Sequence, residues 1–255
     1  MAYRPRILGA ALALLASTGC DFTQQETKNF DSDRALARIE VNVNVGDISV
    51  RDSADGQVHV ESVLTWAEGE PAYTVELVET SPSTPAILKI TARCDSDERC
   101  MVQPRIQAPV DVEIVITGGR SNVDVRGTRG DLSIDTEYGE ISVADLGGDL
   151  DLATRTGNIE GRFLASANVT AATSGTEGMV DLEFKGAPLT VDAETTSGDI
   201  LVTVPQAEYL VDAASQSGEV SITVLEATGV PNTITARSQS GDITIRPPCE
   251  GTTCA

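Results

Sequence analysis

Short runs of alternating hydrophobic and polar residues dominate the chain from Ser121 to Arg246. Alternation over five to seven residues is the pattern of a β-strand with one buried face. The inward residues of these runs are Leu132/Ile134, Ile141/Val143, Leu150/Leu152, Val180/Leu182/Phe184, Ile200/Val202/Val204, Val220/Ile222/Val224 and Ile243/Ile245. The runs follow one another too closely for helices to lie between them, so the pattern predicts an all-β fold and excludes an α/β fold.

A glycine, an acidic or amide residue and an aliphatic residue open most of the runs. The copies are Gly130-Asp131-Leu132, Gly139-Glu140-Ile141, Gly148-Asp149-Leu150, Gly157-Asn158-Ile159, Gly198-Asp199-Ile200, Gly218-Glu219-Val220 and Gly241-Asp242-Ile243, with Gly46-Asp47-Ile48 as an isolated earlier copy. A period near 20 residues is typical of a solenoid. We therefore predict a single-stranded parallel β-solenoid, or β-helix, of about six coils over residues 121–246. The usual crossover rule makes it right-handed, although the sequence leaves the hand open.

The second strand of each unit has its own inner pair, which always ends in alanine: Val169/Ala171, Val191/Ala193, Val211/Ala213 and Ile234/Ala236. A small residue before the turn predicts a core that narrows at this edge. The turns that follow are rich in serine, threonine and glycine, as in residues 195–198, 215–218 and 238–241. Glycine permits a positive φ at a tight corner, and the hydroxyl groups bond to nearby backbone. We expect stacked hydroxyl side chains with a structural role.

These motifs and the opening stretch ARIEVNVNVGDISV resemble the bacterial putative-adhesin family, a domain formerly of unknown function. The resemblance covers roughly residues 36–246. It implies a β-solenoid and a non-catalytic protein of the cell envelope, and it implies little about the ligand.

The first 19 residues have the organisation of a secretory signal peptide. Arg4 and Arg6 precede an apolar run of about ten residues, which is too short to span a bilayer. Ser17-Thr18-Gly19-Cys20 resembles the lipobox of bacterial lipoproteins, which implies a lipid on Cys20 that anchors the chain to a membrane. Leucine is usual where Ser17 stands, so ordinary secretion with cleavage elsewhere stays open, as does the membrane leaflet.

The segments outside the repeat are less regular. Residues 20–35 carry the anchor and are otherwise polar and patternless, which predicts a flexible tether. Residues 36–120 predict strands at 37–44, 47–51, 57–65, 72–78, 86–92 and 110–116 that cap the solenoid. Breaks at 53–56, 81–85 and 102–109 separate them. Residues 247–255 form a tail that we expect to close the other end.

Four cysteines remain when Cys20 is set aside. They form two local pairs, Cys94/Cys100 and Cys249/Cys254. An even number in an exported protein indicates disulfides; three pairings are open, and we favour the two local ones. A four-cysteine zinc site does not fit, because the spacing is not that of a CxxC ribbon.

The chain is strongly acidic, with 18 basic residues, 39 acidic residues and a formal net charge of −21. Such a surface excludes nucleic acid and anionic lipid as electrostatic partners. The charge indicates solubility and resistance to aggregation, or else a cationic partner or a divalent metal.

The acidic residues after the corner glycines are the candidate metal ligands. They are Asp131, Glu140, Asp149, Asp199, Glu219 and Asp242. Where such residues stack at about 4.8 Å, their clustered carboxylates offer the oxygen ligands that Ca²⁺ prefers. The nonapeptide calcium motif G-G-x-G-x-D is met only in part, by Gly147-Gly148-Asp149. We therefore expect no cofactor, with bound calcium as the alternative.

Catalytic chemistry has little support. The sole histidine, His59, lies in an alternating strand between Val58 and Val60, so it should face solvent. This leaves no Ser-His-Asp or Cys-His set unless His59 serves alone, and no G-x-S-x-G motif is present. Phe163, Phe184 and Tyr209 occupy inward positions and are expected in the core.

The sequence thus predicts a non-catalytic envelope lipoprotein with a binding or scaffold surface for an envelope protein or a glycan. Two alternatives stay open: a calcium-stabilised structural module, and a β-helix enzyme that processes polysaccharide.

Overall fold

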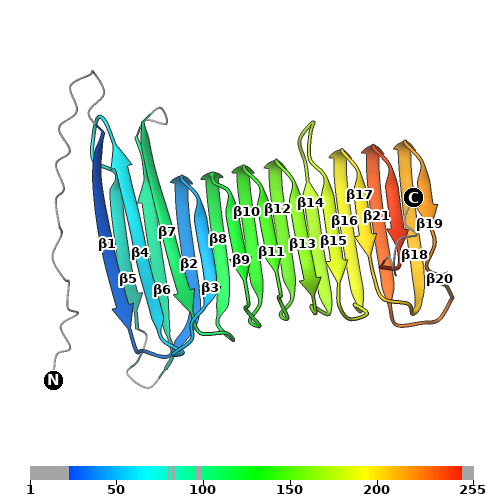
Figure 1. Ribbon diagram of the computed structural model, residues 1–255, viewed down its shortest axis with the longest axis horizontal. Helices are drawn as coiled ribbons and strands as arrows, with labels where there is room; N and C mark the ends of the chain where they lie inside the picture. The colour runs from blue at the N-terminus through cyan, green and yellow to red at the C-terminus, as the bar shows by residue number, and fades with distance from the viewer. Residues whose placement is uncertain (1–22, 80, 82–83, 96–98, 249–255) are drawn as a thin grey trace.

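The computed structural model describes residues 23–248 except 80, 82–83 and 96–98. Its regular elements are all β-strands, and they form two eleven-stranded sheets that run the length of the molecule (Figure 1). None of the described residues belongs to a helix that could span a membrane. The predicted all-β, parallel solenoid is confirmed.

The two sheets are named A and B here. Sheet A contains, in spatial order, β1 (Gln24–Ser32), β4 (Val58–Trp66), β7 (Cys100–Ala108), β3 (Ile48–Asp52), β9 (Val123–Arg126), β11 (Ile141–Ala144), β13 (Ile159–Leu164), β15 (Val180–Phe184), β17 (Ile200–Thr203), β22 (Ile243–Arg246) and β19 (Val220–Ile222). Sheet B contains β20 (Leu225–Glu226), β18 (Glu208–Ser217), β21 (Thr233–Ser240), β16 (Thr190–Ser197), β14 (Asn168–Thr173), β12 (Leu150–Thr156), β10 (Leu132–Tyr138), β8 (Glu113–Arg120), β2 (Leu36–Val45), β6 (Ala86–Arg93) and β5 (Ala72–Val78).

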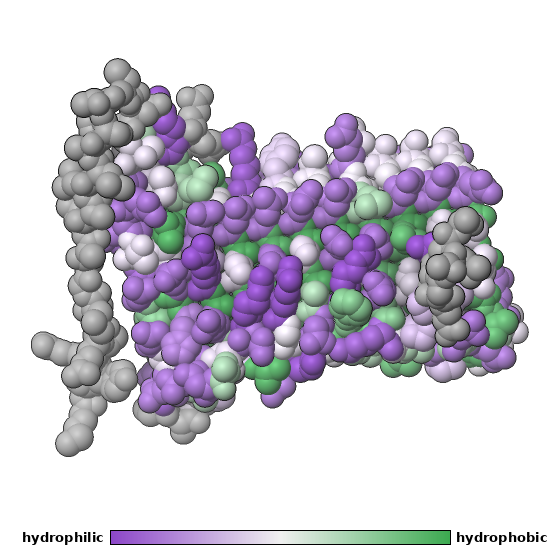
Figure 2. Space-filling view, viewed as in Figure 1, coloured by the Kyte–Doolittle hydropathy of each residue, from purple (hydrophilic) through white to green (hydrophobic). Residues whose placement is uncertain are grey.

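Each regular coil gives one strand to each sheet, and equivalent residues stack in register. Leu132 pairs with Leu150, which in turn pairs with Val169. The aliphatic residues between the sheets form one continuous core along the solenoid axis, whereas hydrophilic side chains cover much of the outside (Figure 2). The alanines at the narrow edge, including Ala171, Ala193 and Ala236, are fully buried as predicted.

The corner glycines allow the coils to stack this closely. Gly157 has a φ of 141°, which residues with a side chain rarely adopt. A Cβ at this position would lie 2.0 Å from the carbonyl oxygen of Gly139. The glycine is therefore required twice, for its backbone angle and for the close approach of the coil below it.

The N-terminal end departs from the prediction. The flexible tether expected over residues 20–35 is wrong for residues 24–32, which form β1 and pair antiparallel with β4 from Gln24↔Trp66 to Ser32↔Val58. Backbone hydrogen bonds to β4 make this segment a strand, and polar side chains suit it because it lies at the sheet edge. Lys28 faces inward there: its Nζ lies 5.9 Å from the ring centroid of Tyr73 and 3.4 Å from Glu70 Oε1.

The break expected at residues 102–109 is also wrong, because β7 occupies this stretch. Pro104 pairs with Ser62 of β4, and the parallel ladder with β3 starts only at Arg105. The proline therefore precedes the part of the strand that is paired on both sides. Residues 36–52 form β2 and β3, which stack as a full coil on β8 and β9, so Gly46-Asp47-Ile48 belongs to the repeat.

At the C-terminal end the coils are out of sequence order. The strands β21 and β22, from the end of the chain, lie between the coil of β16 and β17 and the coil of β18 and β19. Residues 208–226 thus form the outermost layer (Figure 1). The expectation that the tail closes this end does not hold for Pro247 and Pro248, which follow an inner strand, and residues 249–255 lie outside the described part.

Two of the three aromatic residues expected in the core are there. Phe184 and Tyr209 are buried, but Phe163 is 58% exposed. The ladder between β13 and β15 shifts between Gly161 and Leu164, and Phe163 has a positive φ of 54°. This bulge turns Phe163 outward and places Leu164 in the core, which a strict alternation cannot predict.

Candidate functional site

Several acidic side chains on the outer wall of sheet A have arginine partners. On sheet A, Arg51 lies 2.5 Å from Asp124, and Arg126 contacts the same carboxylate at 3.0 Å. Arg162 contacts Glu160 on its own strand, β13, and Asp181 on the neighbouring strand β15. At these two places on sheet A, the charges of the acidic side chains are therefore neutralised by arginine.

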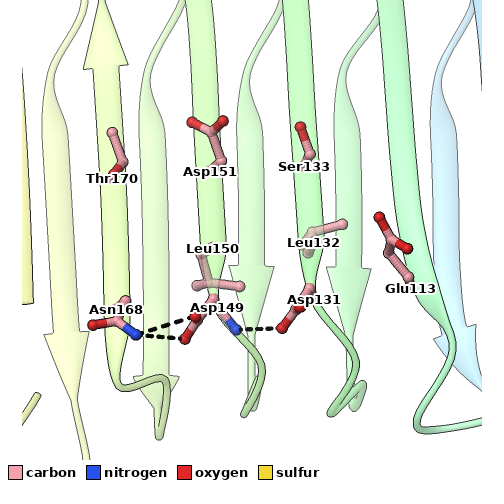
Figure 3. Close-up of a pocket in the computed structure, with 9 residues that line it drawn as sticks. All are labelled: Glu113, Asp131, Leu132, Ser133, Asp149, Leu150, Asp151, Asn168 and Thr170. Carbon is pink, nitrogen blue, oxygen red and sulfur yellow. Dashed lines mark hydrogen bonds between the residues drawn. The ribbon is translucent and has the colours of Figure 1, made fainter.

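The outer wall of sheet B carries a shallow groove across β8, β10, β12 and β14, with a cavity volume of about 260 Å³. Figure 3 shows its residues, which come from equivalent positions of successive coils. They are Glu113, Asp131, Leu132, Ser133, Asp149, Leu150, Asp151, Asn168 and Thr170. Glu113 is ion-paired with Arg38 at 2.9 Å and raises the pKa of that guanidinium. No ion pair of the described residues involves Asp131, Asp149 or Asp151.

Hydrogen bonds between coils fix the lower rim of the groove. The backbone N–H of Asp149 donates to Asp131 Oδ1 at 3.0 Å (Figure 3). The side-chain amide of Asn168 donates to both oxygens of Asp149, at 3.0 and 3.1 Å. The carboxylates are thus held in a row by their own fold, while Asp151, Ser133 and Thr170 point outward above them.

The six acidic corner residues lie on two edges of the solenoid. Asp131 and Asp149 precede strands of sheet B, whereas Glu140, Asp199, Glu219 and Asp242 precede strands of sheet A. On the second edge Asp199 Oδ1 accepts the N–H of Asp242, and Asp242 Oδ1 accepts the N–H of Glu219, both at 2.8 Å. Among the described residues, no group of three or more His, Cys, Asp or Glu side chains could hold a metal ion.

This ladder explains the recurring Asp and Asn residues at the corners. Asn122 Oδ1 accepts the N–H of Glu140, and Asn158 Oδ1 accepts the N–H of Met179, both at 2.9 Å. Asp and Asn carry an acceptor oxygen at the same distance from the backbone, so either one satisfies the next coil. The residue type follows from the geometry of coil stacking and requires no cation.

His59 lies at the surface between two carboxylates. Its Nδ1 is 2.7 Å from Asp31 Oδ1 and its Nε2 is 3.1 Å from Asp55 Oδ2. The hydrogen bond to Asp31 raises the pKa of His59, whereas the Ser53 hydroxyl and the Gln57 N–H lower the pKa of Asp55 to about 2.

This cluster lacks the order of a catalytic triad. Ser53 Oγ donates to Asp55 Oδ1 at 2.6 Å, so its contact is with a carboxylate. A Ser-His-Asp triad needs the imidazole hydrogen-bonded to the nucleophile. Both nitrogens of His59 instead face carboxylates, and the arrangement ties β1 to β4 and to the turn that follows β3.

Cys94 and Cys100 form a disulfide with a Cα–Cα distance of 5.7 Å. Asn44 holds Cys94 in place, because its side-chain amide donates to the Cys94 carbonyl and its Oδ1 accepts the Cys94 N–H, both at 2.8 Å. Cys20, Cys249 and Cys254 lie outside the described residues.

Five groove residues were not singled out from the sequence: Glu113, Ser133, Asp151, Asn168 and Thr170. Their outward phase in the alternation was readable, but the pattern gives every coil an outward row on each wall. Only the structure shows which outward residues are ion-paired and which lie beside a groove.

Several solved structures are similar to this chain at low sequence identity. A putative adhesin from Bacteroides fragilis is similar at 15% identity and a TM-score of 0.46, over 88% of this chain and 97% of that one. A putative lipid binding protein from Parabacteroides distasonis is similar at 13% identity and a TM-score of 0.45, over 88% of this chain and 97% of that one. A putative cell adhesion protein from Clostridium sporogenes is similar at 14% identity and a TM-score of 0.37, over 89% of this chain and 100% of that one. No curated protein matches the chain.

At TM-scores below 0.5 these likenesses identify neither a ligand nor an activity. The sequence itself carries the assignment: the model of the Toastrack DUF4097 family matches residues 111–246, which is more than half of the chain and spans the groove. The resemblance to an adhesin-like solenoid family is confirmed, and the chain belongs to the Toastrack DUF4097 family.

Proposed function

We propose that this protein is a non-catalytic lipoprotein of the cell envelope that presents the outer wall of sheet B as a binding and scaffold surface. The observation that supports this most strongly is the row of acidic side chains at the groove on this wall. Asp124, Glu160 and Asp181 on sheet A have arginine partners. In contrast, Asp131, Asp149 and Asp151 border an open groove, and no ion pair of the described residues involves them.

The chemistry of the groove favours binding over catalysis. Asp131 and Asp149 are already engaged in hydrogen bonds between coils, and the arrangement repeats from one coil to the next. A catalytic site needs groups converging on one reacting atom, with proton donors and acceptors of different pKa. A repeated row of like groups suits an extended ligand that makes the same contact several times.

A cationic, extended segment of an envelope protein is the ligand class that fits best, because its basic side chains would face the unpaired carboxylates. Surface electrostatics of this kind favours association rate and specificity, and it weakens with salt. A glycan is the second class, since Ser133, Thr170 and Asn168 offer hydroxyl and amide groups in the same groove.

The proposed lipid on Cys20 would set the orientation. Because β1 begins at Gln24, the backbone from Cys20 to the first strand can extend to no more than about 14 Å. The end of the solenoid that contains β1 would then lie close to the membrane, and the end that contains β18 would point away from it (Figure 1).

The test is crosslinking in cells followed by pull-down. The native chain is compared with Asp149→Asn/Asp151→Asn, and Glu68→Gln/Glu177→Gln serves as the control, because it removes the same charge from exposed turns away from the groove. We expect one set of partners to be lost only from the groove variant. Equal recovery from all three chains would refute the wall as the binding surface.

Anchoring is tested separately with Cys20→Ala. We expect this variant to leave the membrane fraction while its groove still binds the same partner in solution. A Cys20→Ala chain that fractionates like the native one would refute the lipid anchor and leave the groove assignment intact.

A further inference from the structure

The C-terminal end of the solenoid has an open sheet edge. Residues 210–217 of β18 pair with β21 on one side, and β20 covers only Glu208 and Tyr209 on the other side. In sheet A the last strand, β19, pairs with β22 alone. Among the described strands, both sheets therefore end here without an outer neighbour.

Backbone groups of both edge strands point into this open space. Glu219 O and Thr223 N bond to β22, and Leu210 N bonds to Asn232 on the side of β21. Because alternate residues of a parallel strand direct their backbone groups to opposite sides, those of Val211, Ala213, Val220 and Ile222 face outward. The Tyr209 carbonyl confirms this phase, because it accepts the Ala227 N–H from the outer side.

The side chains of the same strands leave an apolar surface at this end. Val211, Ala213 and Ile222 are only partly buried, while Val220 is 37% and Leu225 is 63% exposed. Hydrophobic surface is visible at this end in Figure 2. Exposed edges of this kind pair readily with another strand unless charge, proline or a covering segment prevents it.

The N-terminal end has such protection. There β1 and β5 cover the core in antiparallel pairs, and Lys28 faces inward between Glu26 and Glu70. The equivalent inward positions of β18 and β19 carry aliphatic residues and serine. The two ends of the stack are thus built differently, and only the C-terminal one is ready to receive a strand.

Charge decides which strand fits. No Lys or Arg lies between Lys185 and Arg237, and the acids in that stretch are Asp192, Glu194, Asp199, Glu208, Asp212, Glu219 and Glu226. Arg237 is already bonded to Asp212, whereas Glu208 and Glu226 flank the edge of β18 and Glu219 precedes β19. A second copy of the chain would bring the same carboxylates together, so like charges oppose end-to-end self-association.

We propose that this edge binds an extended polypeptide segment in which apolar residues alternate with lysine or arginine. The segment adds a strand to β18 or β19, its apolar side chains continue the core over Val211 and Ala213 or over Val220 and Ile222, and its basic side chains face the flanking glutamates. This mode is β-strand addition, in which backbone hydrogen bonds give affinity and alternate side chains give specificity. It does not depend on the proposed function of the sheet B wall.

The probe is a fluorescent eight-residue peptide of alternating valine and lysine, measured by anisotropy against the purified full chain. The blocking variant is Ala213→Pro/Val220→Pro. Both backbone N–H groups face the open edge, so proline removes no ladder bond within the chain. Circular dichroism and the melting temperature establish that the variant is folded. The control for general attraction to acidic surface is Glu68→Gln/Glu177→Gln, which removes two charges from exposed turns outside both the groove and this edge.

We expect the peptide to bind the native chain and the Glu68→Gln/Glu177→Gln chain alike, and to bind the proline variant at least tenfold more weakly. Glu208→Gln/Glu226→Gln should weaken binding without abolishing it, and a valine–glutamate peptide should not bind. Equal binding to the native and proline chains would overturn the proposal, as would the absence of binding. A native dimer that the prolines separate into monomers, seen by sedimentation, would overturn it in favour of a second copy.

Discussion

The guanidinium of Arg162 donates two hydrogen bonds, of 2.7 and 2.6 Å, to the carboxylate of Asp181 across the β13–β15 ladder. The side chain of Asp181 is only 12% exposed, and this pair raises the pKa of Arg162. Loss of the arginine would leave a nearly buried carboxylate without its charged partner.

Arg162→Met should therefore lower the free energy of unfolding by about 1.5–3 kcal/mol, the range for hydrogen bonds to charged groups. Urea denaturation followed by circular dichroism measures this. Arg126→Met is the matched control, because its pair with Asp124 is more exposed and should contribute at most about 1 kcal/mol. Equal losses for the two variants would contradict the importance of burial.

Gly157→Ala should destabilise the solenoid strongly, since it adds a Cβ 2.0 Å from a backbone oxygen at a strained φ. Backbone strain and overpacking each contribute about 1–3 kcal/mol. Gly186→Ala is the control, because no atom lies within 4 Å of its added Cβ. The melting temperature should fall clearly for the first variant and change little for the second.

The acidic ladder should contribute through hydrogen bonds and not through a metal. Asp242→Ala removes the acceptor of the Glu219 N–H and should cost about 1 kcal/mol, whereas Asp242→Asn keeps an acceptor oxygen and should cost less. Adding EDTA should leave the melting temperature of the native chain unchanged. A clear fall with EDTA, reversed by calcium, would support the calcium-stabilised alternative.

The contacts of His59 should make stability depend on pH. Its pKa in the folded state is raised, so the stabilisation is fully present below the unfolded value near 6.5 and is lost as the pH rises through the folded pKa. The lowered pKa of Asp55 acts in the opposite direction: its contribution is present above about 4 and is lost as the pH falls towards 2.

The melting temperature of the native chain should thus decline between pH 6 and 8 more than that of His59→Gln. Because His59 is the sole histidine, proton NMR can follow its titration directly. Asp31→Asn should move the pKa of His59 back towards 6.5. A pKa unchanged by this substitution would show that Asp31 is not its main cause.

The Cys94–Cys100 disulfide closes a small loop, with a sequence separation of 6. The loop-entropy relation gives about 2 kcal/mol of stabilisation for a loop of this size. Cys94→Ser/Cys100→Ser should lose that amount in urea denaturation. The same loss on reduction of the native chain would assign it to the bond, whereas no change on reduction would assign it to the serine substitutions.

The regular coils were predictable from the sequence because the position of each residue there follows from a local requirement, either strand alternation or the geometry of a corner. Leu150 and Leu152 are buried because the strand alternates, and Gly157 is a corner because no other residue fits. The alternation rule did not predict β1, because this strand is held by backbone hydrogen bonds to β4 and its inward residues include Lys28. The rule also misplaced Phe163, because a bulge shifts the register of its strand. Long-range pairing leaves no trace in the local pattern.

The site was predictable only in part for a similar reason. Asp131 and Asp149 stood out because they follow corner glycines, and both lie at the groove. Asp151 looked like any outward residue of a strand. Its difference from Asp181, which has Arg162 as a partner, depends on which coils stack on which wall.

The inverted order of the last two coils has a consequence for how the chain assembles. The strand β18 is synthesised before β21, yet its native partner is β21, so residues 208–217 must wait for residues 233–240. Until then the place beside β16 is vacant, and the two competing coils carry the same Ser-Gln-Ser-Gly turn, at 215–218 and 238–241. The earlier coil can dock there first and must leave again, which predicts a slow refolding phase from a misplaced but native-like intermediate.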